Sequence, residues 1–203
     1  MFRLLFILLM FAGASAHAGN LTGAQKDSVF ELIQSRVQST NTQQVNFTLL
    51  RKIKGLAKPI EQKGKIYHVS PNNLRYELVQ EKSWVMVMKN QEVYIKDGDS
   101  KVQKRGKMMS KASDFIVSAV NGDLMKSEDF KSTASTNDGL VQAQFTPVNK
   151  KILNHVSLVK VHFNADHDVK EFVIIQPNGN SVQFSFSNLK RNQDISDSLF
   201  VLK

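Results

Sequence analysis

The stretch Gly64–Leu78, which reads Gly-Lys-Ile-Tyr-His-Val-Ser-Pro-Asn-Asn-Leu-Arg-Tyr-Glu-Leu, decides the fold that the sequence predicts. Its first half is an extended segment, in which every second residue shares a face, so Ile66 and His68 lie on the same side. Pro71-Asn72-Asn73 ends this segment, because Pro has no N–H for a strand ladder and Asn tolerates turn geometry. Apolar and polar residues alternate again after the break. The stretch is therefore predicted to be a strand, a turn and a second strand.

More strands are predicted on both sides of this stretch. Residues 45–49 alternate between apolar and polar before it, and Trp84–Met88 is a wholly apolar run after it. Such a run is either buried on both faces or has one face turned to a cavity. Pro177–Asn180 marks a hairpin, because Asn-Gly accepts the positive φ angles of a tight turn. The other predicted strands are 93–95, 102–105, 140–145, 156–163, 169–176, 181–187 and 198–202.

Two segments show the spacing of amphipathic helices. The first, residues 22–39, begins with Thr22 or Asp27 as its N-cap. The second, residues 111–121, ends at Asn121-Gly122-Asp123, a sequence typical of a helix C-terminus. The apolar stripes consist of Val29, Phe30, Ile33 and Val37 in the first helix, and of Ala112, Phe115, Ile116, Ala119 and Val120 in the second.

The first 18 residues have the three parts of a secretory signal peptide. Arg3 is the positive charge at the start, residues 4–11 are apolar, and small residues follow. Cleavage is predicted after Ala18, with Ala16 as the other suitable site. The apolar run is too short to span a bilayer. The sequence thus predicts an exported protein with a single domain over residues 19–203.

Composition narrows the classes of protein that the chain can belong to. It has no Cys, so an exported chain of this length must rely on a hydrophobic core and not on disulfides. The formal charge is +9, which would suit an anionic membrane surface or an acidic partner. We expect no nucleic-acid partner, because Lys residues are spread along the chain without a run and no recognition motif accompanies them.

Signals for catalysis and for metal binding are weak, and we expect neither an enzyme nor a cofactor. The chain lacks a Cys nucleophile, a Gly-x-Ser-x-Gly elbow and a His-Glu-x-x-His motif. His162 and Asp166-His167-Asp168 are the one cluster with ligand-type side chains, but much of it falls in a predicted turn. Asp97-Gly98-Asp99 lacks the Glu that would complete a calcium loop, since Met108 takes that position. We predict no metal site.

The order of these elements and several local strings resemble the LolA family of periplasmic outer-membrane lipoprotein carriers, in particular its shorter, Lys-rich members. The resemblance extends over nearly the whole chain after the signal peptide. The matching strings are Val45-Asn46-Phe47-Thr48, Gly64-Lys65-Ile66, Ser70 to Glu77, the hairpin from Val85 to Tyr94, the helix with Phe115, Phe145-Thr146-Pro147, Gly179-Asn180, Phe184 to Asn188, Ile195-Ser196 and Leu199-Phe200.

The resemblance implies a mainly β fold with a few helices. In this fold an incomplete, strongly curved antiparallel β-barrel has helices over its concave apolar face. It also implies a soluble periplasmic carrier that accepts lipoprotein acyl chains from an inner-membrane ABC transporter. The carrier shields these chains in a hydrophobic cavity and delivers them to an outer-membrane acceptor. We expect a monomer. Two alternatives stay open, namely a carrier of another lipid or glycolipid and a lipoprotein-sensing regulatory domain.

The strand alternation and the resemblance together predict the residues of an acyl-chain site. We place Val45, Phe47, Leu49, Ile66, Leu74, Tyr76, Trp84, Met86, Phe145, Phe163 and Phe184 on the concave wall. We assign Phe30, Ile33, Val37, Phe115, Ile116 and Val120 to helices that cover it as a lid. Well-studied members of the family hold the lid with an Arg immediately before the Pro, whereas this chain has Ser70 there.

Overall fold

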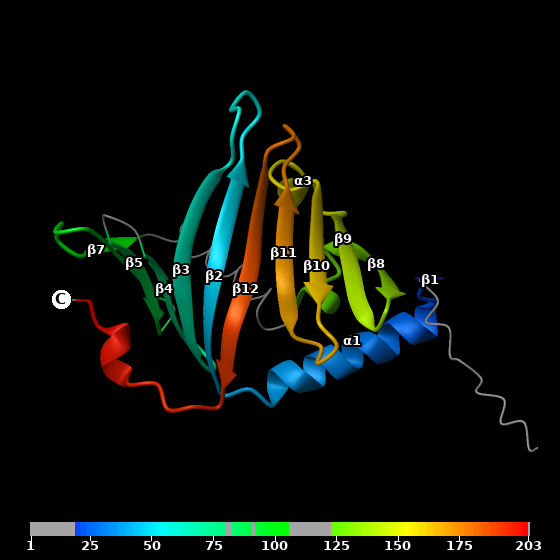
Figure 1. Cartoon of the computed structure of the whole chain (residues 1–203), viewed down its shortest axis with the longest axis horizontal. Helices are drawn as coiled ribbons and strands as arrows, with labels where there is room; N and C mark the ends of the chain where they lie inside the picture. Colours follow the sequence, from blue (N-terminus) through cyan, green and yellow to red (C-terminus); the bar gives the residue numbers. More distant parts are fainter. Residues whose placement is uncertain (1–18, 80–82, 91, 106–122, 203) are drawn as a thin grey trace, which may run out of the picture.

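The computed structural model describes residues 19–79, 83–90, 92–105 and 123–202. The predicted signal peptide therefore lies outside the described residues. So does the predicted second helix, with Phe115, Ile116 and Val120. The described part of the chain is mainly β, as predicted, and Figure 1 shows one broad sheet with a long helix across one end.

In the described part of the chain, twelve strands form a single sheet in which every pair is antiparallel. Its order is β1-β8-β9-β10-β11-β12-β2-β3-β4-β5-β6-β7. The strands are β1 (Gly19–Asn20), β2 (Thr42–Lys52), β3 (Ile60–Val69), β4 (Asn73–Leu78), β5 (Trp84–Lys89), β6 (Glu92–Asp97), β7 (Gln103–Arg105), β8 (Phe130–Asn137), β9 (Leu140–Pro147), β10 (Leu158–Phe163), β11 (Val169–Ile175) and β12 (Ser181–Arg191). The helices are α1 (Gly23–Gln38) and α3 (Lys150–Leu153), with short 3₁₀ turns η1 (Asp123–Met125) and η2 (Asp197–Phe200).

The predicted strong curvature is wrong, because the sheet is neither closed nor strongly curled. Closing a barrel requires the two edge strands to pair with each other along their length. Here the edges are β1 and β7, which have only 2 and 3 residues, so neither offers a ladder of useful length. Short edge strands also limit pairing with other chains.

The stretch Gly64–Leu78 forms the predicted strand, turn and strand. Strand β3 pairs with β4 from Gly64↔Leu78 to Val69↔Asn73, and the peptide before Pro71 is cis. The two halves of the sheet, one made of β1 and β8 to β12 and the other of β2 to β7, are joined where β12 pairs with β2. A register shift between Ser187 and Lys190 interrupts this pairing, which resumes at Lys190 and Arg191.

Helix α1 begins as the sequence predicts, with Thr22 as its N-cap. The Thr22 N–H donates to Gln25 Oε1 at 3.0 Å, which satisfies one of the backbone donors exposed at a helix start. The buried side chains of the helix are Phe30 and Ile33. Within the described residues, no helix is both long enough and apolar enough to cross a membrane.

The last predicted strand, at 198–202, is wrong, because residues 197–200 form the 3₁₀ turn η2. This turn packs on β4 and β5 and buries Phe200. It lies on the face of the sheet opposite to Leu74 and Tyr76. On that face Arg75 donates from Nη1 to the Leu199 carbonyl at 2.9 Å. Strand β5 is therefore buried on both faces. Met86 and Met88 are buried on the face of Leu74, and Val87 is buried on the face of Arg75.

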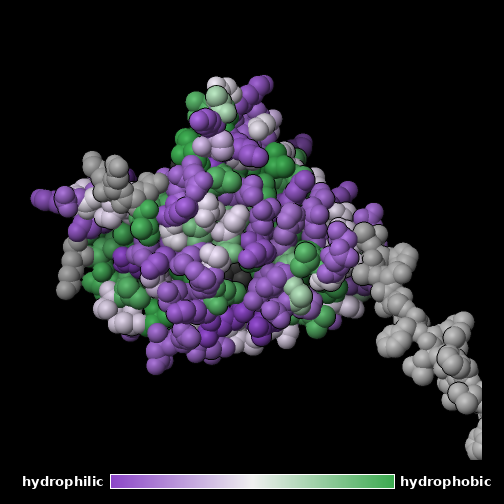
Figure 2. All heavy atoms as spheres, in the orientation of Figure 1, coloured by the Kyte–Doolittle hydropathy of each residue, from purple (hydrophilic) through white to green (hydrophobic). Residues whose placement is uncertain are grey.

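The hairpin between β2 and β3 projects beyond the rest of the sheet (Figure 1). Its tip exposes Leu56 and Ile60 by 53% and 41% among several lysines. Figure 2 shows hydrophobic and hydrophilic residues intermixed on this projection, while hydrophilic residues cover much of the remaining face in that view.

Candidate functional site

All of the predicted wall residues lie on one face of the sheet, which we call the inner face. Strand pairing aligns Val45 with Ile66, Ile66 with Tyr76, and Tyr76 with Met86. A second aligned row runs from Phe47 through Gly64 and Leu78 to Trp84. The predicted wall residues are all buried except Trp84, which is partly buried and packs against the same core. Their contact with an acyl chain stays a prediction.

Helix α1 covers part of the inner face, over the strands from β8 toward β11 (Figure 1). The Phe30 ring stacks on Phe145 with centroids 6.0 Å apart, and Ile33 is only 1% exposed. Lys26 Nζ donates to Ser132 Oγ of β8 at 3.3 Å. The apolar stripe of the predicted first lid helix is therefore packed against the sheet.

A cavity of about 80 Å³ remains between α1 and the inner face. Its apolar lining consists of Ile33, Val37, Val45, Ile66, Met125, Phe163, Val169, Phe172, Phe184, Phe186 and Leu189. The predicted residues Val45, Ile66, Phe163 and Phe184 are among them, together with Ile33 and Val37 of the lid helix. The other predicted wall residues lie in the surrounding core and do not line this space, namely Phe47, Leu49, Leu74, Tyr76, Trp84, Met86 and Phe145.

One end of the inner face is an aromatic cluster, which we call the aromatic end. It consists of Phe47, Tyr76, Trp84 and Phe184. Phe47 stacks on Tyr76 at 4.7 Å and meets Phe184 edge-on at 5.6 Å, while Tyr76 meets Trp84 edge-on at 5.8 Å. The Phe47 ring lies directly over Gly64, where an added Cβ would come within 2.4 Å of it. Burial raises the pKa of the Tyr76 hydroxyl.

The opposite end is polar, and we call it the polar end. It consists of Arg36, Gln43, His68, Asp168 and Arg191, which all line the cavity. Register places Arg191, Gln43 and His68 in one row across β12, β2 and β3. This row lies two residues, or about 6.6 Å, beyond the row of Val45 and Ile66.

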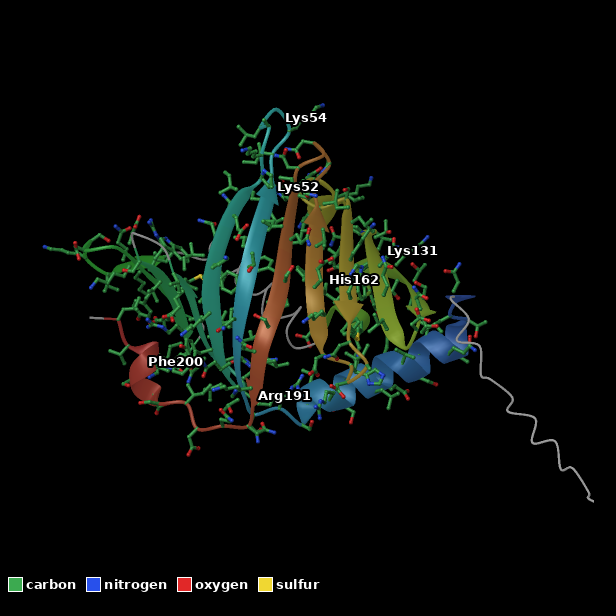
Figure 3. The ribbon with its side chains drawn as sticks, in the orientation of Figure 1. Lys52, Lys54, Lys131, His162, Arg191 and Phe200 are labelled. Atoms are coloured by element: carbon green, nitrogen blue, oxygen red, sulfur yellow. The ribbon has the colours of Figure 1, made fainter. Side chains whose placement is uncertain are left out.

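Asp168 joins α1 to the sheet at the polar end. Its carboxylate pairs with Arg191 of β12, and Arg36 Nε of α1 lies 3.6 Å from the same oxygen. The backbone holds Asp168 in place, because its N–H donates to Asn164 Oδ1 at 2.8 Å. Figure 3 shows Arg191 at the end of β12, close to the C-terminal end of α1.

His68 is the buried polar residue of the described core and is 5% exposed. Its Nε2 atom has no hydrogen-bond partner among the described residues. Burial lowers the pKa of the His68 imidazole, because the low-dielectric surroundings disfavour its charged form. The sequence alternation in β3 places His68 on the same face as Ile66. That alternation is the sequence signal that His68 faces the cavity.

The segment after α1 is held at its connection to β2. Asn192 follows β12 with a positive φ of 51°. Its Nδ2 donates to the Ser39 carbonyl at 3.0 Å, and its Oδ1 accepts from the Asn41 N–H at 2.8 Å. One side chain thus fixes both ends of the turn that leads out of α1.

The residues that most resembled metal ligands are used in other ways. His162 Nδ1 lies 3.2 Å from Glu171 Oε1, and His167 sits in a turn with a φ of 63°. Asp168 pairs with the two arginines. Over the ranges that the structure describes, no group of three or more His, Asp or Glu is placed to hold a metal ion.

Comparison with known proteins gives a family match and a set of distant structures. The family model described as outer membrane lipoprotein carrier protein LolA matches residues 38–203. No curated protein matches the chain in sequence. Lipoprotein LppX from Mycobacterium tuberculosis has a TM-score of 0.51 at 10% identity, covering 86% of this chain and 99% of that one. This likeness supports the fold alone.

Two further solved structures are similar over most of the chain. A LolA superfamily protein from Nitrosomonas europaea has a TM-score of 0.46 and 11% identity, with 87% of this chain and 97% of that chain covered. A putative outer membrane lipoprotein-sorting protein domain from Vibrio parahaemolyticus has a TM-score of 0.40 and 7% identity, with 86% and 97% covered.

Proposed function

The chain belongs to the LolA family of outer membrane lipoprotein carrier proteins, and on this premise we propose that it shields lipoprotein acyl chains and moves them from the inner to the outer membrane. The family is periplasmic and non-catalytic. The proposed donor is an inner-membrane ABC transporter, and the proposed recipient is an outer-membrane acceptor. Residues 1–18 are the proposed signal peptide, which is removed to leave one domain over residues 19–203.

The observation that carries this proposal is the way in which α1 packs on the part of the inner face formed by β8 to β11. Pockets for lipid-sized or drug-sized ligands enclose roughly 300–1,000 Å³, whereas only about 80 Å³ remains beneath α1. An acyl chain can therefore occupy the space beneath α1 only when α1 moves away from the sheet. The wall that α1 then uncovers is apolar from Val45 to Phe145, which suits a saturated chain.

The energies of this exchange favour binding that is reversible. Each methylene transferred from water contributes about 0.8 kcal/mol, so ten of them contribute about 8 kcal/mol. Moving α1 exposes Phe30 and Ile33, and each exposed side chain costs about 1.5–3 kcal/mol. A carrier must release what it binds, and the packed helix offsets part of the gain from the acyl chain.

Cross-linking α1 to the sheet tests this proposal directly. The chain has no Cys, so Lys26→Cys with Ser132→Cys introduces a unique pair. In the native protein Lys26 Nζ lies 3.3 Å from Ser132 Oγ. A short bismaleimide across this pair should abolish acyl-chain uptake. The same double variant capped with N-ethylmaleimide is the matched control and should retain uptake. Uptake that is unchanged by the cross-link would contradict a lid role for α1.

Native mass spectrometry of protein recovered from its own cells separates the alternatives. A mass increase equal to a triacylated protein supports the lipoprotein carrier. A small lipid adduct supports a carrier of another lipid or glycolipid. Recovery without lipid but with a protein partner supports a sensing domain. Correct lipoprotein sorting after depletion of the protein would contradict the carrier function.

A further inference from the structure

The polar end of the cavity is unusual for a site that would take acyl chains alone. Going from Phe47 to Val45 to Gln43 along β2, the inner face changes from aromatic to aliphatic to polar. The same change runs along β12, from Phe184 and Phe186 to Arg191. A ligand lying along these strands would meet an apolar wall first and charged groups at its end.

Charge at the polar end is not balanced. Arg36 and Arg191 supply two guanidinium groups, and Asp168 is the one carboxylate among the described residues that both of them meet. One positive charge is therefore left over in a site whose Asp168 and Arg191 side chains are only 11% and 19% exposed. Arginine pairs favour carboxylate and phosphate groups, which their planar forks bind with two parallel hydrogen bonds.

A second, independent observation points into the same space. His68 shares the inner-face row of Gln43 and Arg191, lines the cavity, and is 95% buried, since 5% of it is exposed. Its Nε2 has no hydrogen-bond partner among the described residues. A buried polar atom without a partner costs free energy, and a polar ligand group at this end would supply the missing hydrogen bond.

We propose that the polar end binds the anionic headgroup of an acyl amphiphile, whose chain lies along the apolar rows toward the aromatic end. The inference rests on the proposed function, because the chain needs the space that α1 leaves. The headgroup is a carboxylate or a phosphate, and it replaces the Asp168 carboxylate at Arg191 and Arg36. Since Arg36 belongs to α1, this exchange also breaks the direct contact between α1 and Asp168.

The test compares three probes with the same saturated chain, namely a fatty acid, a lysophosphatidic acid and a monoacylglycerol. Binding to the purified protein is measured by isothermal titration calorimetry below the critical micelle concentration of each probe. We expect the anionic probes to bind about tenfold more tightly than the neutral one, as one charge-assisted contact would give. The difference between the fatty acid and the lysophosphatidic acid identifies carboxylate or phosphate as the preferred group.

Three variants assign the preference to the polar end. Arg191→Gln and Arg36→Gln should each weaken anionic binding about tenfold relative to binding of the neutral probe. Arg36 has a side chain that is 47% exposed, so its replacement keeps the fold even if that of Arg191 does not. Asp168→Asn should strengthen binding of the anionic probes more than binding of the neutral probe, because it frees both arginines as well as loosening α1. Lys52→Gln, at an exposed position on the projecting hairpin (Figure 3), is the matched control with one charge fewer.

The outcomes distinguish this inference from the proposed function. Equal binding of charged and neutral probes, unaltered in the arginine variants, would overturn the headgroup site and leave the carrier function intact. An equal gain for all probes in Asp168→Asn would show that Asp168 acts as a latch only, which also overturns the headgroup site. If none of the probes bound, the acyl-carrier proposal itself would fail, and the headgroup inference with it.

Discussion

The aromatic end and the polar end of the inner face lie on the same strands but are stabilised by different interactions. Phe47 at the aromatic end has ring contacts with Tyr76 and Phe184 and lies against the backbone of Gly64. At the polar end, Asp168 holds two arginines that come from α1 and β12. Water cannot replace the apolar ring contacts of the aromatic end, whereas a ligand anion can take the place of the Asp168 carboxylate at the polar end.

This difference suggests that the two ends of the inner face have different roles. The aromatic end should be rigid, because close-packed interiors respond to the loss of even a few atoms. The polar end should be the place where α1 separates from the sheet, because the pair that ties α1 there joins Asp168 to the 47% exposed Arg36, and exposed ion pairs contribute little to stability. The following predictions test that contrast, beginning with the largest expected effect.

Phe47→Ala should cause the largest loss of stability. The Phe47 side chain is 2% exposed and contacts two other aromatic rings, so its removal should lower the free energy of unfolding by about 3–5 kcal/mol. Urea denaturation followed by circular dichroism measures this change. Phe130→Ala, at a partly buried position of β8 that is outside this cluster, serves as the control and should cost clearly less. Equal losses would contradict a special role for the aromatic end.

Gly64→Ala should have the next largest effect at the same end. Its Cβ would lie 2.1 Å from the Glu77 carbonyl oxygen and 2.4 Å from the Phe47 ring, so backbone must move. We expect a loss of about 1–3 kcal/mol in the free energy of unfolding, again measured in urea. At Gly23 an added Cβ meets nothing within 4 Å, so Gly23→Ala should be neutral or slightly stabilising. A neutral Gly64→Ala would show that this contact is loose.

Asp168→Asn should have a smaller effect, confined to the polar end. Loss of the carboxylate removes the ion pairs to Arg36 and Arg191 and should reduce the docking free energy of α1 by about 1 kcal/mol. Hydrogen exchange should therefore accelerate in residues 23–38 and stay unchanged at the aromatic end. Glu61→Gln breaks the exposed pair with Lys63 and should alter neither region. Global acceleration in Asp168→Asn would mean that the two ends are not separable.

His68 should give the smallest effect, seen as a pH dependence of stability. The folded state lowers its pKa through burial, so the unfolded chain takes up a proton first as the pH falls. Stability is therefore complete above the unfolded pKa of about 6.5 and is lost as the pH falls through the folded pKa. His68→Asn should flatten the unfolding free energy between pH 7 and 5, while exposed His155→Asn should not. An unchanged slope in His68→Asn would contradict this assignment.

Much of the inner face could be predicted from the sequence, because alternation along a strand is a local property. Val45, Phe47, Ile66 and Tyr76 share a face as predicted, since each lies in a clear period-2 pattern. The sequence does not predict strand β8, because its Ser and Thr residues give little contrast between apolar and polar positions. The sequence predicts a strand where the structure has the turn η2, because a short apolar run such as Leu199-Phe200 does not distinguish the two.

The polar end could not be predicted in the same way. Arg36 and Asp168 stand far apart in the chain, and each looks like an ordinary surface charge in its own segment. They meet because β12 pairs with β2 and because α1 crosses the ends of the neighbouring strands. Nothing near Arg36 or Asp168 in the sequence indicates that they would meet.

The sequence by itself determined the strands, the first helix and which of their side chains share a face, because hydrophobic period and capping act over a few residues. The tertiary structure alone decided that the sheet stays open, that α1 covers part of the inner face, and that Asp168 joins two arginines beside His68. These features depend on which strands become neighbours. That choice is made by burial and charge pairing between distant segments, and no local pattern records it.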